Sequence, residues 1–185
     1  MPNTYSQIYI QIVFAVKGRQ NLIPNIHKDE LYKYISGIIR NKDQKLIAIN
    51  GIPDHIHILI GLKPDAALSD LVRDIKANSS KFINDKKWIQ GKFNWQEGFG
   101  AFSYSHSHLD RIISYIKNQE KHHSKTTFKE EYQKLLEKFS VEYNTKYLFE
   151  WNKSFFKRYL ESLALLDNVN RLPYFWNVFL KKTHR

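Results

Sequence analysis

Hydrophobic side chains recur with two different periods along the chain, and these periods predict where strands and helices lie. Apolar residues at every second position of residues 5–16 predict a strand with one face in the core. Residues 27–41 carry apolar side chains at helical spacing, which predicts an amphipathic helix. Two further strands are predicted over 45–50 and about 54–62, separated by a turn at Gly51-Ile52-Pro53.

The second half of the pattern completes a recognisable order of elements. It predicts a helix opening at Pro64 and Asp65, a strand within "AFSYSH", and a helix over about 108–123. Thr127 and Glu130 resemble a capping box that starts a later helix. The order strand, helix, strand, strand, helix, strand predicts an α+β fold of the ferredoxin-like, split βαβ type. We expect an antiparallel sheet with helices on one face, and the other face free for a partner or a ligand.

Charge changes the picture by suggesting a partner. Among 185 residues, 29 Lys and Arg stand against 18 Asp and Glu, which gives a net charge of +11. A polyanion such as nucleic acid is the natural partner for such a surface. A basic protein with no such partner has the same composition, so charge alone leaves both readings open.

Several classes of protein are excluded by what the sequence lacks. There is no cysteine, which excludes disulfides and thiolate chemistry and suits the cytoplasm of a bacterial-type cell. No stretch approaches the roughly 18 uninterrupted apolar residues that a membrane span needs. The first residues have no basic segment followed by a small-residue cleavage site, so we expect no signal peptide.

The strand "DHIHILI" carries the first candidate chemistry. Residues two apart in a strand point the same way, so His55 and His57 share one face while the isoleucines share the other. Two imidazoles on one rigid sheet face can hold one divalent ion. A bare His-x-His pair also occurs on solvated sheet faces, so the pair alone does not decide between these readings.

Two other histidine pairs are weaker candidates. His106 and His108 lie where a strand passes into a helix, so their side chains need not converge. His122 and His123 are neighbours on a predicted helix and point about 100° apart. Neither pair combines parallel side chains with a buried anchor.

The predicted helix over 108–123 offers a reactive group and a further ligand. Tyr115 and Gln119 are four residues apart and therefore lie on one helix face, with His108 and His122 near the same line. A surface tyrosine and a surface glutamine give the same spacing, so this pair is informative only together with the histidines.

The combination of "PDHIHILI" with "YIKNQ" about sixty residues later resembles the HUH nuclease superfamily. The resemblance is to its single-tyrosine transposases of small insertion sequences, including repeat-associated tyrosine transposase relatives. The stretches "IYIQIVFAVKGRQNLI", "LSDLVRDIKANSSKFI" and "FNWQEGFGAFSYS" fit the same pattern. Residues 1–151 are therefore expected to form the transposase domain, followed by a C-terminal helical extension of unknown role over 152–185.

This resemblance implies a site and a reaction. His55, His57 and Gln119 would bind a divalent metal, and Tyr115 would be the nucleophile that forms a 5′-phosphotyrosine. The ion would be Mg²⁺ or Mn²⁺, since imidazole ligands favour Mn²⁺ while Mg²⁺ is usual for the family. The substrate would be single-stranded DNA with hairpin-containing element ends, and the protein a homodimer.

Two questions stay open at the level of the sequence. Arg73, Lys76 and Lys81 lie off the apolar stripe of the second predicted helix and could hold DNA phosphates, although a solvated basic face looks the same. The alternative function is a non-catalytic module that binds single-stranded DNA or RNA on a ferredoxin-like sheet. Such a module would have no need of the tyrosine and metal constellation.

Overall fold

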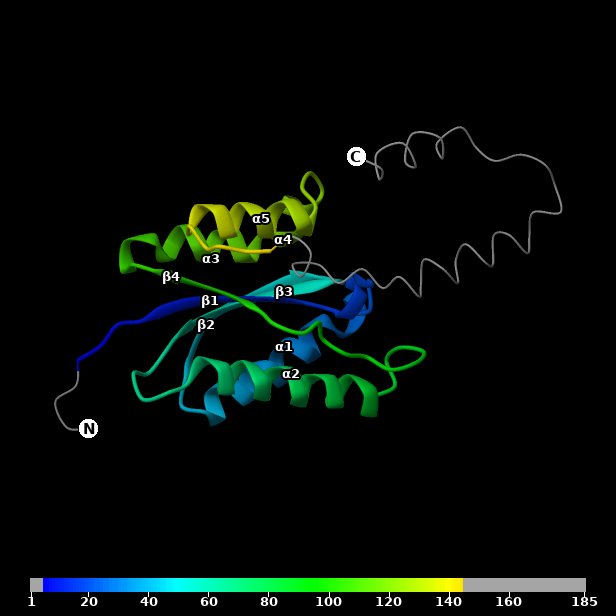
Figure 1. Cartoon of the computed structure of the whole chain (residues 1–185). Coiled ribbons are helices and arrows are strands. Elements are labelled where there is room, and N and C mark those ends of the chain that lie inside the picture. The colour runs from blue at the N-terminus through cyan, green and yellow to red at the C-terminus, as the bar shows by residue number, and fades with distance from the viewer. Residues whose placement is uncertain (1–4, 145–185) are drawn as a thin grey trace, which may run out of the picture. The chain divides into compact units, whose positions relative to one another are not determined.

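The computed structural model describes residues 5–144, which form one α+β unit around a four-stranded sheet (Figure 1). The strands are paired in the order β2-β3-β1-β4, and the three pairings are antiparallel. This is the sheet order of the predicted split βαβ arrangement. The strands are β1 (Tyr9–Ala15), β2 (Lys45–Ile52), β3 (His55–Gly61) and β4 (Gly100–Tyr104).

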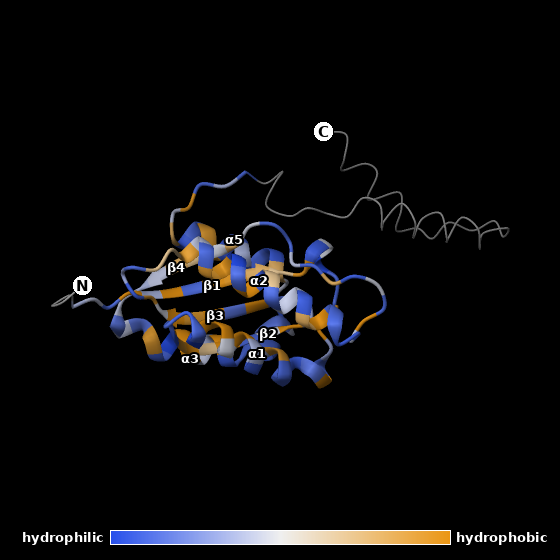
Figure 2. Ribbon diagram, turned by 90° about the horizontal axis from the view of Figure 1, so that it is seen from below, coloured by the Kyte–Doolittle hydropathy of each residue, from blue (hydrophilic) through white to orange (hydrophobic). Residues whose placement is uncertain are grey.

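Five α-helices and three short 3₁₀ turns accompany the strands in the described part of the chain. The helices are α1 (Lys28–Asn41), α2 (Leu68–Asp85), α3 (Leu109–Lys117), α4 (Gln119–His123) and α5 (Phe128–Lys138). The 3₁₀ turns are η1 (Lys17–Arg19), η2 (Asn25–His27) and η3 (His106–His108). Hydrophobic and hydrophilic stretches alternate along the helices, as expected of amphipathic segments (Figure 2). None of the helices within residues 5–144 could span a membrane.

The main core lies between the sheet and the helices α1 and α2. Ile56, Ile58 and Ile60 of β3 are fully buried there, together with Ile35 and Ile39 of α1. These isoleucines therefore anchor β3 in the core. Because side chains alternate along a strand, their burial on this face directs His55 and His57 to the opposite one.

The other face of the sheet is covered as well, which corrects the expectation of a free face. Above the sheet in Figure 1, α3 and α5 lie across it, whereas α1 and α2 lie below. Val13 of β1 and Phe102 of β4 pack against α5, and Leu59 of β3 packs against α3. The strands carry apolar side chains on both faces of the sheet, so both faces must be covered by helices.

A tight connection places His55 at the start of β3. Gly51 pairs with Ile56 in the β2–β3 ladder, and a methyl group at Gly51 would overlap the carbonyl oxygen of His55. Only a residue without a Cβ fits this approach. The predicted Gly-Ile-Pro turn is therefore shifted into the end of β2, and the reversal itself occupies Pro53 and Asp54.

The single predicted helix over 108–123 is divided in the structure. Asn118, with ψ of 24°, separates α3 from α4, and its side-chain amide donates to the carbonyl oxygen of Ser114 at 2.7 Å. Asparagine competes for backbone partners in this way and so interrupts helices. As a result, Tyr115 lies on α3, whereas Gln119 is the first residue of α4.

Candidate metal and tyrosine site

The histidines of β3 lie under α4 and α5 rather than on a solvated sheet face. The side chains of His55 and His57 are fully buried, and their ring centroids are 5.0 Å apart. The ring of Phe128, the first residue of α5, stacks on His55 with a centroid distance of 4.2 Å. Burial without solvent means that each ring nitrogen must be satisfied by the protein or by a ligand.

One ring nitrogen of each histidine has a dedicated partner. His55 Nδ1 lies 2.7 Å from Oδ1 of Asp54, and Oδ2 of the same carboxylate lies 3.8 Å from the guanidinium of Arg19. His57 Nδ1 lies 2.9 Å from the amide of Gln11, and Gln11 accepts a hydrogen bond from the hydroxyl of Tyr104 at 2.9 Å. Rotation of the Gln11 side-chain amide by 180° would exchange the positions of its nitrogen and oxygen. The oxygen would then accept the Nδ1 proton of His57. Both Nε2 atoms are thereby directed into the same space.

The predicted third ligand and the predicted nucleophile reach that space from the helices. Gln119 is fully buried, and its Oε1 lies 3.3 Å from His55 Nε2. The ring centroid of Tyr115 lies 5.9 Å from that of His57. Burial, and after it the negative charge of Glu131, raise the pKa of Tyr115 above its usual value. The structure thus brings together all four residues that the sequence singled out, within one chain.

Glu131 of α5 lies at the centre of this group, and the sequence pattern alone did not single it out. Its side chain is 3% exposed. Its Oε2 lies 3.1 Å from His123 Nε2, 3.3 Å from His57 Nε2 and 3.5 Å from His55 Nε2. Its Oε1 accepts hydrogen bonds from the Tyr115 hydroxyl and, at 3.1 Å, from the amide of Gln119.

A sequence signal for Glu131 exists in the pattern of α5. The capping box between Thr127 and Glu130 is present as predicted, so the register of the helix is fixed. In that register Glu131 stands three residues after Phe128 and four before Leu135, inside the apolar stripe. An acid in an apolar stripe needs a partner, and this requirement marks it as a candidate site residue.

His123 is the second site residue that the sequence pattern did not single out. The rings of His122 and His123 are inclined at 84°, with centroids 5.2 Å apart. His123 lies within the group, where its Nδ1 lies 2.8 Å from the carbonyl oxygen of Thr126 and its Nε2 faces Glu131. His122 lies beside Tyr115, with ring centroids 5.3 Å apart, and its Nε2 lies 3.7 Å from Oε1 of Glu131.

Electrostatics keep the group polarised. Burial alone would raise the pKa of Glu131, but the hydrogen bond from His123 and the nearby imidazole of His57 outweigh it and hold that pKa far below its usual value. Burial lowers the pKa of His123, and the bond to Glu131 reverses this, so that its pKa is raised. Burial also lowers the pKa of His55. As a result, Glu131 is a carboxylate that faces imidazole nitrogens.

The donor set fits a divalent cation. One ligand atom each of His55, His57, His123 and Glu131 lies within 4.8 Å of the others. Two ligands of one ion, each at about 2.1 Å, are at most about 4.2 Å apart, so only small side-chain shifts are needed. In addition, His57 Nε2 is buried without a hydrogen-bond partner among the described residues. An ion between these donors would satisfy that atom.

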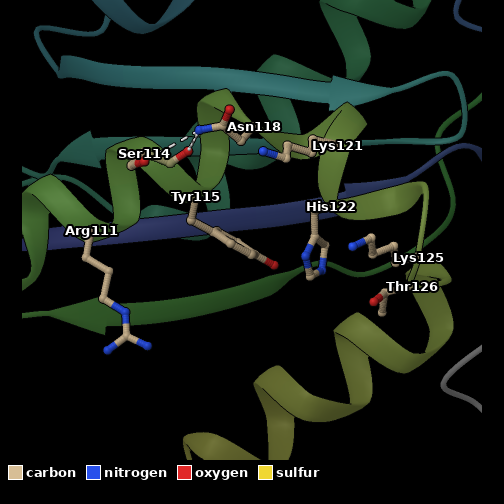
Figure 3. A pocket seen from close by; sticks show the side chains of 8 residues that line it. All are labelled: Arg111, Ser114, Tyr115, Asn118, Lys121, His122, Lys125 and Thr126. Carbon is tan, nitrogen blue, oxygen red and sulfur yellow. Dashed lines mark hydrogen bonds between the residues drawn. The ribbon is translucent and has the colours of Figure 1, made fainter.

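Tyr115 also borders an open groove of about 480 Å³. Figure 3 shows its hydroxyl directed toward His122, with basic side chains on both sides. Among the described residues, none forms an ion pair with the exposed Arg111, Lys121 or Lys125 that line this groove. The remaining lining residues are Ser114, Asn118 and Thr126. The groove therefore offers unpaired positive charge beside the tyrosine.

The basic residues predicted to hold DNA lie elsewhere. Arg73, Lys76 and Lys81 belong to α2, on the sheet face opposite to His55. Arg73 pairs with two aspartates, Lys81 pairs with Asp85 at 2.6 Å, and the ammonium of Lys76 donates to two backbone carbonyls. Their charges are thus already engaged within the chain, and their role in DNA binding stays a prediction.

The sheet order, the paired histidines and the tyrosine helix define a protein of the tyrosine-transposase class. Residues 4–119 match the family of IS200-like transposases, and the chain belongs to this family. The resemblance found in the sequence is thereby confirmed.

Individual relatives agree with this assignment. The chain is similar to the ISDra2 transposase TnpA of Deinococcus radiodurans, with 23% identity over 120 residues, 61% of this chain and 84% of that protein. Its fold is similar to that of a putative transposase from Deinococcus radiodurans (21% identity, TM-score 0.52, 64% of this chain and 95% of that one). It is also similar to a REP-associated tyrosine transposase bound to a REP hairpin (17% identity, TM-score 0.52, 66% and 73%).

Proposed function

We propose that this protein is a metal-dependent transposase that cleaves and rejoins single-stranded DNA through a 5′-phosphotyrosine on Tyr115. The observation that supports this most directly is the shared carboxylate of Glu131. The hydroxyl of Tyr115 and the Nε2 atom of His57 contact the two oxygens of that one carboxylate. A nucleophile and a metal site are therefore close enough to act on the same phosphate.

His55, His57 and Gln119 would hold the divalent ion, Mg²⁺ or Mn²⁺. When bound, the ion would neutralise charge on the scissile phosphate and orient it. Asp54 and Gln11 would fix the two imidazoles through Nδ1, so that their Nε2 lone pairs face the ion. Without the metal, the protein would still fold with Asp54 and Gln11 bonded to the two histidines, but it would not cleave DNA.

Tyr115 would attack the phosphorus with its hydroxyl oxygen. The new bond joins that oxygen to the 5′-phosphate, the bond to the 3′ oxygen breaks, and the leaving strand carries away a 3′-OH. Covalent capture conserves the energy of the phosphodiester, so a second 3′-OH can rejoin the strands without ATP. The phenol proton needs an acceptor, and the nearby histidines of this segment are candidates: His122 lies beside Tyr115, whereas His108 is bonded to Ser105 at 2.7 Å.

The DNA strand would enter along the groove beside Tyr115. Arg111, Lys121 and Lys125 would neutralise its phosphates on either side of the scissile bond. One structurally similar transposase is bound to a REP hairpin. The proposed substrate is therefore single-stranded DNA with hairpin-containing element ends. The homodimer and the cytoplasmic location expected from the sequence belong to the same proposal.

A denaturing gel tests the proposal directly. The protein is mixed with end-labelled single-stranded DNA from the regions flanking its gene, with Mn²⁺ or with EDTA, and Tyr115→Phe is compared with Tyr34→Phe. Tyr34 lies on α1, on the far side of the sheet, and serves as the matched control. We expect a slow, protease-sensitive adduct that EDTA and Tyr115→Phe both abolish. Tight binding without an adduct would favour the non-catalytic binding module instead.

A further inference from the structure

We propose that Glu131 and His123 are metal ligands in addition to His55, His57 and Gln119, so that the bound ion ties α4 and α5 to β3. This inference rests on the proposed metal site and adds two donors that lie beyond residues 4–119, the part of the chain that matches the family. The third imidazole and the carboxylate would make the site richer in donors than the predicted set of three.

The surroundings of His123 are those of a metal ligand. A histidine that binds a metal usually donates its other ring N–H to a carboxylate or a backbone carbonyl. His123 has this arrangement through Thr126, just as His55 has it through Asp54. In both rings the partner occupies Nδ1 and leaves Nε2 facing the common space. An imidazole on a surface helix has no need of such an orienting partner.

Glu131 supplies what the predicted ligands lack, namely negative charge. His55, His57 and Gln119 are neutral as ligands, whereas Mg²⁺ and Mn²⁺ prefer carboxylate oxygens. The Oε2 atom of Glu131 faces three imidazole nitrogens at 3.1–3.5 Å. With an ion among these donors, the carboxylate would be a ligand, and its burial would be compensated by a full positive charge rather than by hydrogen bonds alone.

The consequence for the fold is a metal-dependent attachment of α5. This helix already contacts the site through Phe128, whose ring lies on His55, and packs on β1 and β4 through Leu135 and Leu136. A ligand from α5 and another from α4 would connect both helices to the central strand. Since Tyr115 donates its hydrogen bond to Glu131, the same tie would position the nucleophile.

The test measures Mn²⁺ affinity by the EPR signal of free Mn²⁺, using the full chain. Glu131→Gln and His123→Ala are compared with Glu137→Gln, an exposed acid on the same helix, and with His106→Ala, an exposed histidine of η3. His57→Ala reports on the predicted site itself. We expect Glu131→Gln and His123→Ala each to weaken affinity at least about tenfold, the lower end of the loss seen when a ligand's outer partner is removed. The two control variants should retain the wild-type affinity.

Two further measurements on the wild-type protein do not depend on a variant folding. Nitrogen modulation in pulsed EPR of bound Mn²⁺ should report three imidazoles, and Mn²⁺ should slow amide hydrogen exchange in α5. Two imidazoles, together with wild-type affinity in Glu131→Gln, would overturn the inference while leaving the proposed function intact. If the wild-type protein and His57→Ala bind Mn²⁺ equally weakly, the metal part of the proposed function fails as well.

Discussion

The hydroxyl of Tyr115 on α3 donates a hydrogen bond to Oε1 of Glu131 on α5. The two residues are on different helices, so their interaction links α3 to α5 at the site. The other oxygen of the same carboxylate faces the imidazoles. Nucleophile position and metal-site electrostatics therefore depend on one side chain, and substitution of Glu131 is informative about both.

We predict that Glu131 makes the metal-free protein sensitive to acid. Its folded-state pKa lies below the unfolded value near 4.5, so the stability it contributes is present above pH 4.5 and is lost as pH falls below it. In EDTA at pH 7, Glu131→Gln should lower the free energy of unfolding by about 2 kcal/mol, a typical value for hydrogen bonds to a charged group. Below pH 4.5 this difference should shrink by up to about 1.4 kcal/mol per pH unit.

Urea unfolding at pH 7 and pH 3.5 checks this prediction. Glu137→Gln, on the exposed side of α5, serves as the control and should show little effect at either pH. A loss in Glu131→Gln that is equally large at both pH values would mean that the substitution acts through packing and not through charge.

The difference between what could and could not be predicted has a physical cause. Alternation along "DHIHILI" directs the histidines of β3 to one face, because strand geometry is local. Tyr115 and Gln119 follow from spacing over one turn, and the interruption at Asn118 did not separate them. Glu131 required knowledge of where α5 lies, and this is decided by tertiary packing of its apolar side chains on β1 and β4. Helical periodicity shows which side of α5 is buried but not what it is buried against.

The same reasoning explains why the expectation of a free sheet face is wrong. The isoleucines of β1 indicate one buried face, whereas Val13 and Ala15 on the other face are apolar too and support a second helical layer. The helical layer on this face of the sheet, and the site beneath it, both depend on these apolar residues. The C-terminal extension over 152–185 lies outside the described residues, and its role stays a prediction.

Gln11 is predicted to control metal affinity through His57. Gln11→Leu keeps the volume of the buried side chain but removes the partner of His57 Nδ1. Mn²⁺ affinity should fall about 10–100-fold, as found for outer-shell partners of metal ligands. Tyr104→Phe removes only the outer link to Gln11 and should cause a smaller loss.

Gln44→Leu is the matched control for this experiment. Gln44 is also a buried glutamine, but it bonds to the backbone of Lys42 and Lys63, away from the histidines. Its substitution should lower stability without changing metal affinity. Equal affinities in Gln11→Leu and the wild type, measured by titration calorimetry, would show that His57 is oriented without Gln11.

The groove and α2 make separate predictions about DNA binding. Replacement of Arg111, Lys121 and Lys125 by glutamine should weaken binding of single-stranded DNA. The slope of log K against log salt should also decrease by about 0.7 for each DNA phosphate that is no longer neutralised. Glutamine at Arg73, Lys76 and Lys81 should have the smaller effect, because these charges are engaged within α2 and its neighbouring loop.

Fluorescence anisotropy with labelled DNA at several salt concentrations compares the two triple variants. Both remove three positive charges, so a general effect of net charge is matched between them. A larger loss of affinity in the α2 variant would place the DNA path on the opposite side of the sheet, in favour of the residues predicted from the sequence.

Gly51 is predicted to be essential for the placement of His55. In Gly51→Ala the new methyl group would overlap the carbonyl oxygen of His55, so the β2–β3 ladder must shift. Such overpacking costs about 1–3 kcal/mol in the free energy of unfolding. Displacement of His55 should weaken Mn²⁺ binding in the same variant.

Gly37→Ala is the matched control, since nothing lies within 4 Å of its added methyl group in α1. Helix propensity predicts that Gly37→Ala stabilises the protein by up to about 1 kcal/mol with unchanged Mn²⁺ affinity. Urea unfolding and Mn²⁺ titration of both variants check the pair, and a Gly51→Ala protein as stable as the wild type would contradict the close approach of the two strands.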